Sequence, residues 1–169
     1  MLYSVGDKVI HFNGGVFIIS DFKVMNCGQN NIKYYCLTPY YNDTSKKNTL
    51  VVYVPEGKAN ELIRPLLTKD EAECLIREIK EIEPIWFNDM KERKNTFDDL
   101  VGTKKLKEIY TVFKSLYVQQ EKLMGENKSL NLLDYDCLNK VKKGIVEELS
   151  ISLNIPLENV EKYLIERII

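Results

Sequence analysis

Residues that could carry out catalysis are few in this sequence of 169 residues. The single imidazole, His11, falls within a run of strand-forming residues, and no serine or cysteine lies in a nucleophile motif. His11 is either a catalytic base or a strand residue with a satisfied ring, and its apolar surroundings favour the second interpretation. We therefore predict no catalytic residue and no enzyme activity.

Metal and phosphate sites are equally poorly supported. No two cysteines have metal-ligand spacing, and we interpret all four as small apolar fillers: Cys27, Cys36, Cys74 and Cys137. The acids Asp98-Asp99 and Glu147-Glu148 are adjacent and do not share a helix face. Asn13-Gly14-Gly15 favours a hairpin turn, because no GxGxxG pattern follows it. We expect no metal, no cofactor and no small-molecule substrate.

The net charge of the whole chain does not indicate a nucleic-acid partner, since 24 Lys and Arg are balanced by 25 Asp and Glu. Two local clusters are basic, Lys104-Lys105-Lys107 and Lys140-Lys142-Lys143. Each could neutralise phosphates, but interspersed acids favour a solvated helix face. The start of the chain lacks a signal-peptide pattern and no apolar run reaches the length of a membrane span, so we expect a cytoplasmic protein.

Trp86 is the sole tryptophan and follows Glu83-Pro84-Ile85. A lone tryptophan is most often a buried anchor. The alternative is a flat ring presented outward at a helix start, where it could act as a wedge. Periodicity does not decide between the two.

The secondary structure expected to position these residues changes along the chain from strands to helices. Short β-branched or aromatic runs at 8–12, 16–19, 33–37 and 50–54 predict strands, and turn-forming clusters at 13–15, 26–31 and 42–48 separate them. We expect them to form a small, strongly bent barrel.

Beyond Pro65 the apolar period becomes helical. Thr68 and Glu71 form a capping-box pattern that starts a helix reaching about Ile82, and a short helix over 85–99 is expected to carry Trp86, Met90 and Lys94. Further apolar stripes predict helices over 103–124, ending at Gly125, and over 131–149 and 156–168. The domain boundary is expected near 65–68.

The order and spacing of several segments resemble CarD-like (CarD/CdnL) transcription regulators. In the first half these are Tyr3 to Ile10, Gly15-Val16, Tyr34 to Leu37 and Val51 to Pro55. They are similar to the RNA polymerase-interacting domain that these regulators share with transcription-repair coupling factor. In the second half the similar features are Ile63 to Leu66 before a helix, a tryptophan at 86, and Leu-Asn-Ile-Pro-Leu-Glu near the end.

The resemblance implies an α+β fold, with a Tudor/SH3-like β-barrel at 1–66 followed by an all-helical domain at 67–169. It also implies that the barrel binds the RNA polymerase β subunit by aligning strand edges. The matching strands carry Lys23, Met25, Val51 and Tyr53. Many relatives have arginine where this chain has Tyr53, so an ion pair to the polymerase is not expected there.

The helical domain is implied to bind promoter DNA. In relatives the tryptophan matching Trp86 enters the minor groove at the upstream edge of the melted bubble, which hinders closure of the duplex. Neighbouring basic residues contact phosphates, and the candidates here are Lys91, Arg93, Lys94, Lys140, Lys142 and Lys143. Because Asn88 and Asp89 directly follow Phe87, and Tyr135 and Asp136 replace basic residues, we expect weak DNA affinity without the polymerase.

The prediction is therefore a regulator of transcription initiation that stabilises the open promoter complex. An alternative is a general RNA- or ribosome-associated binding module, because Val-Gly-Asp-Lys-Val also opens small barrels of that class.

Overall fold

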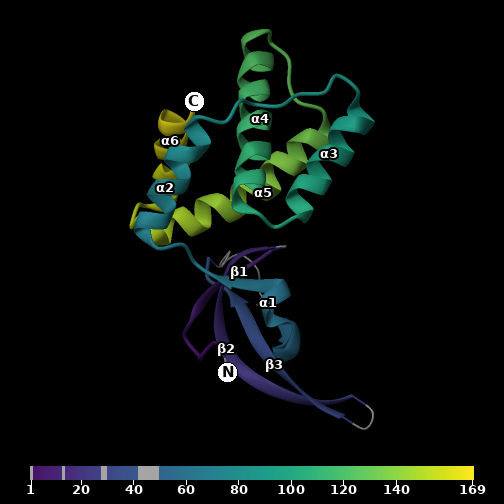
Figure 1. Ribbon diagram of the computed structural model, residues 1–169, viewed down its shortest axis with the longest axis vertical. Coiled ribbons are helices and arrows are strands. Elements are labelled where there is room, and N and C mark those ends of the chain that lie inside the picture. Colours follow the sequence, from purple (N-terminus) through teal and green to yellow (C-terminus); the bar gives the residue numbers. More distant parts are fainter. Residues whose placement is uncertain (1, 13, 28–29, 42–49) are drawn as a thin grey trace. The chain divides into compact units, whose positions relative to one another are not determined.

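The computed structural model describes residues 2–12, 14–27, 30–41 and 50–169. The chain forms two compact units, Met1–Leu66 and Leu67–Ile169 (Figure 1). The first contains a five-stranded antiparallel sheet and the second a bundle of helices. The expectation of a fold that contains both strands and helices is confirmed.

The sheet has the strand order β4-β3-β2-β1-β5. Its strands are β1 (Lys8–His11), β2 (Gly15–Cys27), β3 (Asn30–Pro39), β4 (Val52–Pro55) and β5 (Ile63–Pro65). The 3₁₀ helix η1 (Glu56–Lys58) and the short helix α1 (Ala59–Leu62) connect β4 to β5. Within the described residues β4 and β5 are the two edges, so the sheet is not closed and the predicted small, strongly bent barrel is not confirmed.

A β-bulge between Ile19 and Asp21 allows β2 to remain on the sheet for its full length. Phe17 and Ile19 face the core before the bulge, and the extra residue Ser20 shifts the alternation so that Phe22 faces it afterwards. Figure 1 shows β2 and β3 side by side as a long hairpin. The core of this unit comprises Tyr3, Val9, Phe17, Ile19, Tyr35, Leu37, Val54, Ala59 and Ile63.

The predicted turns fall only partly within the described structure. At the β1–β2 turn Gly15 has a φ of 91°, a conformation that glycine adopts without steric cost. Asn13 of that turn, residues 28–29 of the second turn and the whole turn at 42–48 lie outside the described residues.

The helical unit contains α2 (Lys69–Lys80), α3 (Met90–Gly102), α4 (Leu106–Gly125), α5 (Leu132–Ser152) and α6 (Leu157–Ile168). The predicted capping box is present, because the Thr68 side chain accepts a hydrogen bond from Glu71 N and the Glu71 carboxylate accepts one from Thr68 N. Figure 1 shows α2 beside α6, and α4 in contact with both α3 and α5.

The helical core is contiguous and draws on every helix of this unit. Its fully enclosed side chains include Ile79 of α2, Phe97 of α3, Phe113 and Leu116 of α4, Leu149 of α5 and Leu164 of α6. Burial of each such side chain contributes roughly 1.5–3 kcal/mol of transfer free energy. Within the described residues no helix is both long and apolar enough to cross a membrane.

Candidate nucleic-acid interface

Trp86 lies on a connection between α2 and α3, and the predicted helix over 85–99 therefore begins too early. Helix α3 starts only at Met90, where the Asp89 side chain caps it by accepting a hydrogen bond from Glu92 N at 2.7 Å. Pro84 and the cap leave 81–89 as a non-helical segment, which we call the Trp86 connection. The tryptophan is thus placed by contacts from neighbouring helices rather than by a helix of its own.

The Trp86 side chain is half-buried. Its ring packs edge-to-face against Phe97, with centroids 6.5 Å apart, and the guanidinium carbon of Arg93 lies 4.2 Å from the indole centroid. These contacts belong to the helical core, as the buried-anchor interpretation requires. The residue as a whole is nevertheless only partly buried, so neither interpretation of Trp86 describes it completely.

Helix α4 holds the start of the Trp86 connection. Lys114 is only 6% exposed, and its Nζ donates to the carbonyl oxygens of Ile79, Lys80 and Ile82 at 3.1, 3.0 and 2.8 Å. A cation at this position also complements the negative end of the α2 dipole.

The next residue of α4, Ser115, extends this support. Its Oγ accepts a hydrogen bond from Ile85 N at 2.9 Å and donates one to Thr111 O at 2.7 Å. The residue directly before Trp86 is therefore bonded to α4.

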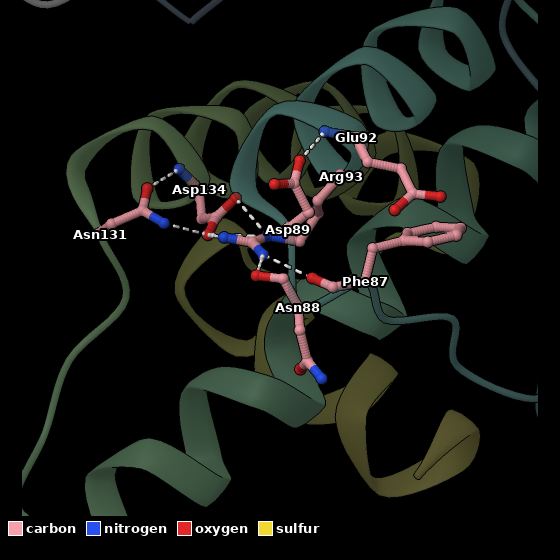
Figure 2. Close-up of polar contacts among 7 residues, drawn as sticks. All are labelled: Phe87, Asn88, Asp89, Glu92, Arg93, Asn131 and Asp134. Carbon is pink, nitrogen blue, oxygen red and sulfur yellow. Dashed lines mark hydrogen bonds and ion pairs between the residues drawn. The ribbon is translucent and has the colours of Figure 1, made fainter.

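Helix α3 holds the other end of the Trp86 connection through Arg93, which is 5% exposed. Figure 2 shows its guanidinium between the Asp134 carboxylate and the backbone of Phe87 and Asn88. Arg93 Nη2 donates to Asp134 Oδ2 at 2.7 Å, Nε lies 3.1 Å from both Asp134 oxygens, and Nη1 donates to Phe87 O at 2.6 Å. Asp134 is itself 4% exposed, so this is a buried ion pair.

These contacts assign Arg93 a structural position. Its guanidinium is enclosed and already bonded to a carboxylate and a carbonyl, so it is not available to a DNA phosphate as we expected from the sequence. We therefore omit Arg93 from the phosphate contacts proposed below. The sequence contains one sign of this role, because Arg93 lies four residues before the buried Phe97 and shares its helix face.

The other basic candidates are distributed over α3 and α5. Lys91 and Lys94 are exposed on α3, and Lys94 pairs with Asp98 one turn later. On α5 Lys140 is exposed, whereas Lys142 Nζ lies 3.2 Å from Glu161 of α6.

Lys143 also has an acidic neighbour, because its Nζ lies 4.0 Å from Glu147 Oε1. The lysine cluster of α5 therefore consists of the exposed Lys140 and two lysines that lie near acids. This arrangement is closer to the solvated-face interpretation than to a phosphate-binding patch.

Cys137 of α5 is partly buried between charged groups. Burial raises the pKa of the Cys137 thiol to about 11, and the carboxylates of Asp98 and Asp134 reinforce the increase, whereas Lys140 and Lys94 oppose it. The thiol is therefore protonated near neutral pH and is a poor nucleophile.

In the sheet unit, three of the four predicted polymerase contacts share one face. The cross-strand pairs Lys23 with Tyr34, Met25 with Ile32 and Cys36 with Tyr53 place these side chains opposite the core face. We call Lys23, Met25, Ile32, Tyr34 and Tyr53 the outer sheet face. Lys23 Nζ lies 5.6 Å from the Tyr53 ring centroid, and Tyr53 is 43% exposed.

The fourth predicted contact, Val51, is 39% exposed and directly precedes β4. In the described part of the chain β4 pairs only with β3, so its second edge is not covered by another strand. An uncovered strand edge is the feature that strand addition by a partner requires.

His11 ends β1, with its ring edge-to-face against Phe17 at 5.7 Å. Among the described residues no three His, Cys, Asp or Glu side chains converge as metal ligands would. Cys74 is exposed, which corrects its interpretation as an apolar filler.

Sequence reasoning missed Asp134, Asn131, Lys114 and Ser115. Only Asn131 and Asp134 carry a local signal, an N-cap residue followed by an acid three positions later. The structure brings Trp86 and Arg93 together and leaves Lys142 on another face. No family model matches the chain, and the search of curated proteins also found no match.

Proposed function

We propose that the chain regulates transcription initiation in the bacterial cytoplasm, with the sheet unit binding the RNA polymerase β subunit and the helical unit contacting promoter DNA. Trp86 enters the minor groove at the upstream edge of the melted bubble and makes reclosure of the duplex less favourable. Phosphate contacts come from Lys91, Lys94 and Lys140, with smaller contributions from Lys142 and Lys143. This proposal adopts the CarD resemblance of the sequence.

One observation carries the proposal for the helical unit. The only tryptophan is half-buried on a non-helical connection that is bonded to α3 and α4. A residue with a purely structural role needs no exposure to solvent, and a free wedge needs no such support. A residue that is held and also partly exposed suits insertion at a distorted base step.

The support for the sheet unit is an accessible face beside an uncovered strand. Tyr53 and Val51 flank the start of β4, and Lys23 lies against the Tyr53 ring. Aromatic residues are enriched at the centres of protein interfaces. Backbone pairing along β4 would provide affinity, and the outer sheet face would provide specificity.

The test of the DNA contact is Trp86→Ala in an assay of open-complex lifetime with purified bacterial RNA polymerase. We expect the half-life to shorten by about tenfold, which corresponds to about 1.4 kcal/mol. Tyr117→Ala is the matched control, because Tyr117 is a half-buried aromatic residue of α4 that lies outside the Trp86 connection.

Thermal unfolding of both variants is measured alongside the lifetimes. If Trp86→Ala and Tyr117→Ala lose equal stability and leave the lifetime equally unchanged, Trp86 is only a core anchor and the proposed wedge is wrong. Trp86→Phe, which retains an aromatic anchor, gives an intermediate lifetime if ring size matters.

The polymerase contact is tested separately with Val51→Glu in a pulldown of the β subunit. We expect capture to be lost, because a carboxylate would be placed beside the edge that the partner must cover. The control is Leu132→Glu, since Leu132 is a 73% exposed apolar residue of the helical unit. Undiminished capture by Val51→Glu would exclude this edge as the docking surface.

A second candidate function is supported by the pairing of lysines with aromatic rings in the sheet unit. Lys8 Nζ lies 4.4 Å from the Tyr40 ring centroid, and Lys23 lies against Tyr53. Exposed aromatic and cationic groups on a sheet can also stack and neutralise single-stranded RNA. Purification of the tagged chain with ribosomes, and without RNA polymerase, would favour this RNA- or ribosome-associated module.

A further inference from the structure

Arg93 lies where three segments of the helical unit meet. It belongs to the first turns of α3, its carboxylate partner Asp134 lies in the first turn of α5, and its backbone acceptors lie in the Trp86 connection. The two partners of the ion pair are 41 residues apart in the chain. The pair therefore joins elements that sequence proximity does not hold together.

The hydrogen bonds of Arg93 use the edge of its planar guanidinium. One edge faces the Asp134 carboxylate through Nε and Nη2, and Nη1 donates to Phe87 O. Because these donors lie in the plane of the group, satisfying all of them fixes the orientation of that plane. The face of the guanidinium remains for packing, and its central carbon lies over the Trp86 ring, 4.2 Å from the ring centroid.

The carboxylate partner is held as firmly as the arginine. Asp134 N donates to Asn131 Oδ1 at 3.0 Å, and Asn131 Nδ2 donates to Asp134 Oδ2 at 2.5 Å (Figure 2). The position of Asp134 in the first turn of α5 also favours its negative charge, because the helix dipole is positive there. The orientation of the guanidinium is thus determined by groups that do not contact Trp86.

We propose that Arg93 is a positioning residue that sets which part of the Trp86 ring is exposed. The bidentate pair with Asp134 fixes the guanidinium plane, and stacking on that plane fixes the indole against Phe97. Lysine cannot replace arginine in this role, because an ammonium group has neither the fork nor the flat face. The consequence for promoter DNA rests on the function proposed above, whereas the effect on the ring does not.

The test uses the full chain, in which Trp86 is the only tryptophan and so the only source of tryptophan fluorescence. Arg93→Lys retains the charge opposite Asp134, and Asp134→Asn retains the arginine. We expect both variants to keep helical circular dichroism and to raise the acrylamide quenching constant of Trp86 at least twofold, with a red-shifted emission. Lys94→Ala is the matched control, because the exposed Lys94 is the next residue of the same helix.

Unchanged quenching in a folded Arg93→Lys variant would overturn the proposal. The wild-type chain supplies a second measurement that does not depend on the folding of any variant. Its time-resolved fluorescence anisotropy should decay only with overall tumbling, since the ring is held on the nanosecond timescale. A large subnanosecond component would show that Arg93 does not hold the indole.

A double-mutant cycle separates an effect of Arg93 on promoter complexes that acts through Trp86 from one that does not. Arg93→Lys should shorten the open-complex lifetime when Trp86 is present and should have no further effect in a Trp86→Ala background. An equal effect in both backgrounds would indicate a structural role that is independent of the ring. If the wild-type chain leaves the lifetime unchanged while quenching responds as expected, the proposed function fails and the positioning role remains.

Discussion

Replacing Lys114 with methionine removes one ammonium group from the helical unit while keeping an unbranched side chain of similar length. The Lys114 side chain is 6% exposed, and its Nζ donates to three carbonyl oxygens at and beyond the end of α2. The last carbonyls of a helix generally lack intrahelical partners, although Ile79 O also accepts a hydrogen bond from Ile82 N at 3.2 Å. Lys114→Met therefore tests how much one buried cation contributes to the end of α2 and to the Trp86 connection.

The expected loss of stability depends on whether water can reach the carbonyl oxygens once the ammonium group is removed. The bond to Ile79 O is buried, whereas those to Lys80 O and Ile82 O are partly buried and would regain water. Ile79 O keeps its bond from Ile82 N, so the loss there is one hydrogen bond to a charged group, which contributes roughly 1.5–3 kcal/mol. Loss of a cation at a helix C-terminus adds roughly 0.3–1 kcal/mol, and relief of ammonium desolvation offsets part of the sum. We expect a net loss of about 2 kcal/mol in the free energy of unfolding.

The assay is urea and thermal unfolding followed by Trp86 fluorescence, because the only tryptophan lies in the helical unit and reports on that unit. For a unit of about 100 residues, a loss of about 2 kcal/mol lowers Tm by roughly 8–16 °C. Lys122→Met is the control, since Lys122 is an exposed lysine of the same helix and its replacement should change stability by less than about 0.5 kcal/mol.

Two results would refute this reasoning. If the urea midpoints of the two variants agree, the three carbonyls do not depend on the ammonium group. If Lys114→Met is more stable than wild type, the cost of burying the charge exceeds the gain from its three hydrogen bonds, as occurs for some buried ion pairs. In either case support of the Trp86 connection would have to come from Ser115 and Arg93 alone.

Three further predictions concern titration, reactivity and salt dependence. The hydrogen bond from the backbone N–H of Thr68 lowers the pKa of the Glu71 carboxyl. The contribution of Glu71 to stability is therefore present above pH 4.5 and is lost as the pH falls through the lowered pKa. Glu71→Gln should reduce the slope of Tm against pH in that range. The pKa of Cys137 is raised to about 11 by burial, so iodoacetamide at pH 8 should alkylate it at least tenfold more slowly than the exposed Cys74, as measured by peptide mass spectrometry. Lys140→Ala should reduce the salt slope of DNA binding by about one, whereas the acid-paired Lys142 should contribute less, as measured by fluorescence anisotropy of labelled DNA at several salt concentrations.

The elements that sequence predicted well are those whose apolar period is long and uninterrupted. The stripe of α4, with Phe113 and Leu116 buried, fixed its position to within a few residues. Strand β2 was predicted to end at Ile19 but extends to Cys27, because the bulge at Ser20 absorbs one residue and Ser20 Oγ donates to Cys36 O. A polar Ser-Asp pair resembles a strand end unless the opposite strand is known.

Short elements depend on partners that are remote in sequence. Strand β5 has only three residues and exists through its pairing with β1, where His11 lies opposite Ile63. No local pattern of that length distinguishes a strand from a loop. The open sheet likewise depends on whether the edge strands β4 and β5 meet, which turn and strand patterns do not determine.

The sequence predicts one residue of the candidate site, Trp86, but not the residues that hold it in place. Trp86 stands out because it is unique, but its partner Arg93 resembles a surface residue, since arginine is seldom fully buried. The burial of Arg93 depends on Asp134, which packing of α5 against the rest of the bundle brings near it. A sequence pattern can place Arg93 on the same helix face as Phe97, but it cannot identify the carboxylate that makes burial of the arginine favourable.

The half-burial of Trp86 bears directly on how a weak DNA ligand could act. A flexible exposed indole would lose roughly 0.5–1.5 kcal/mol of conformational freedom on insertion between bases, whereas a ring already held by Arg93 and Phe97 loses less. That saving matters because Lys94 is paired with Asp98 and Lys142 with Glu161, which weakens their attraction for phosphates. If polymerase binding by the sheet unit raises the local concentration, a positioned ring needs little independent affinity for DNA. Support of the Trp86 connection by Arg93 and Lys114 would then influence open-complex lifetime even though neither side chain reaches the nucleic acid.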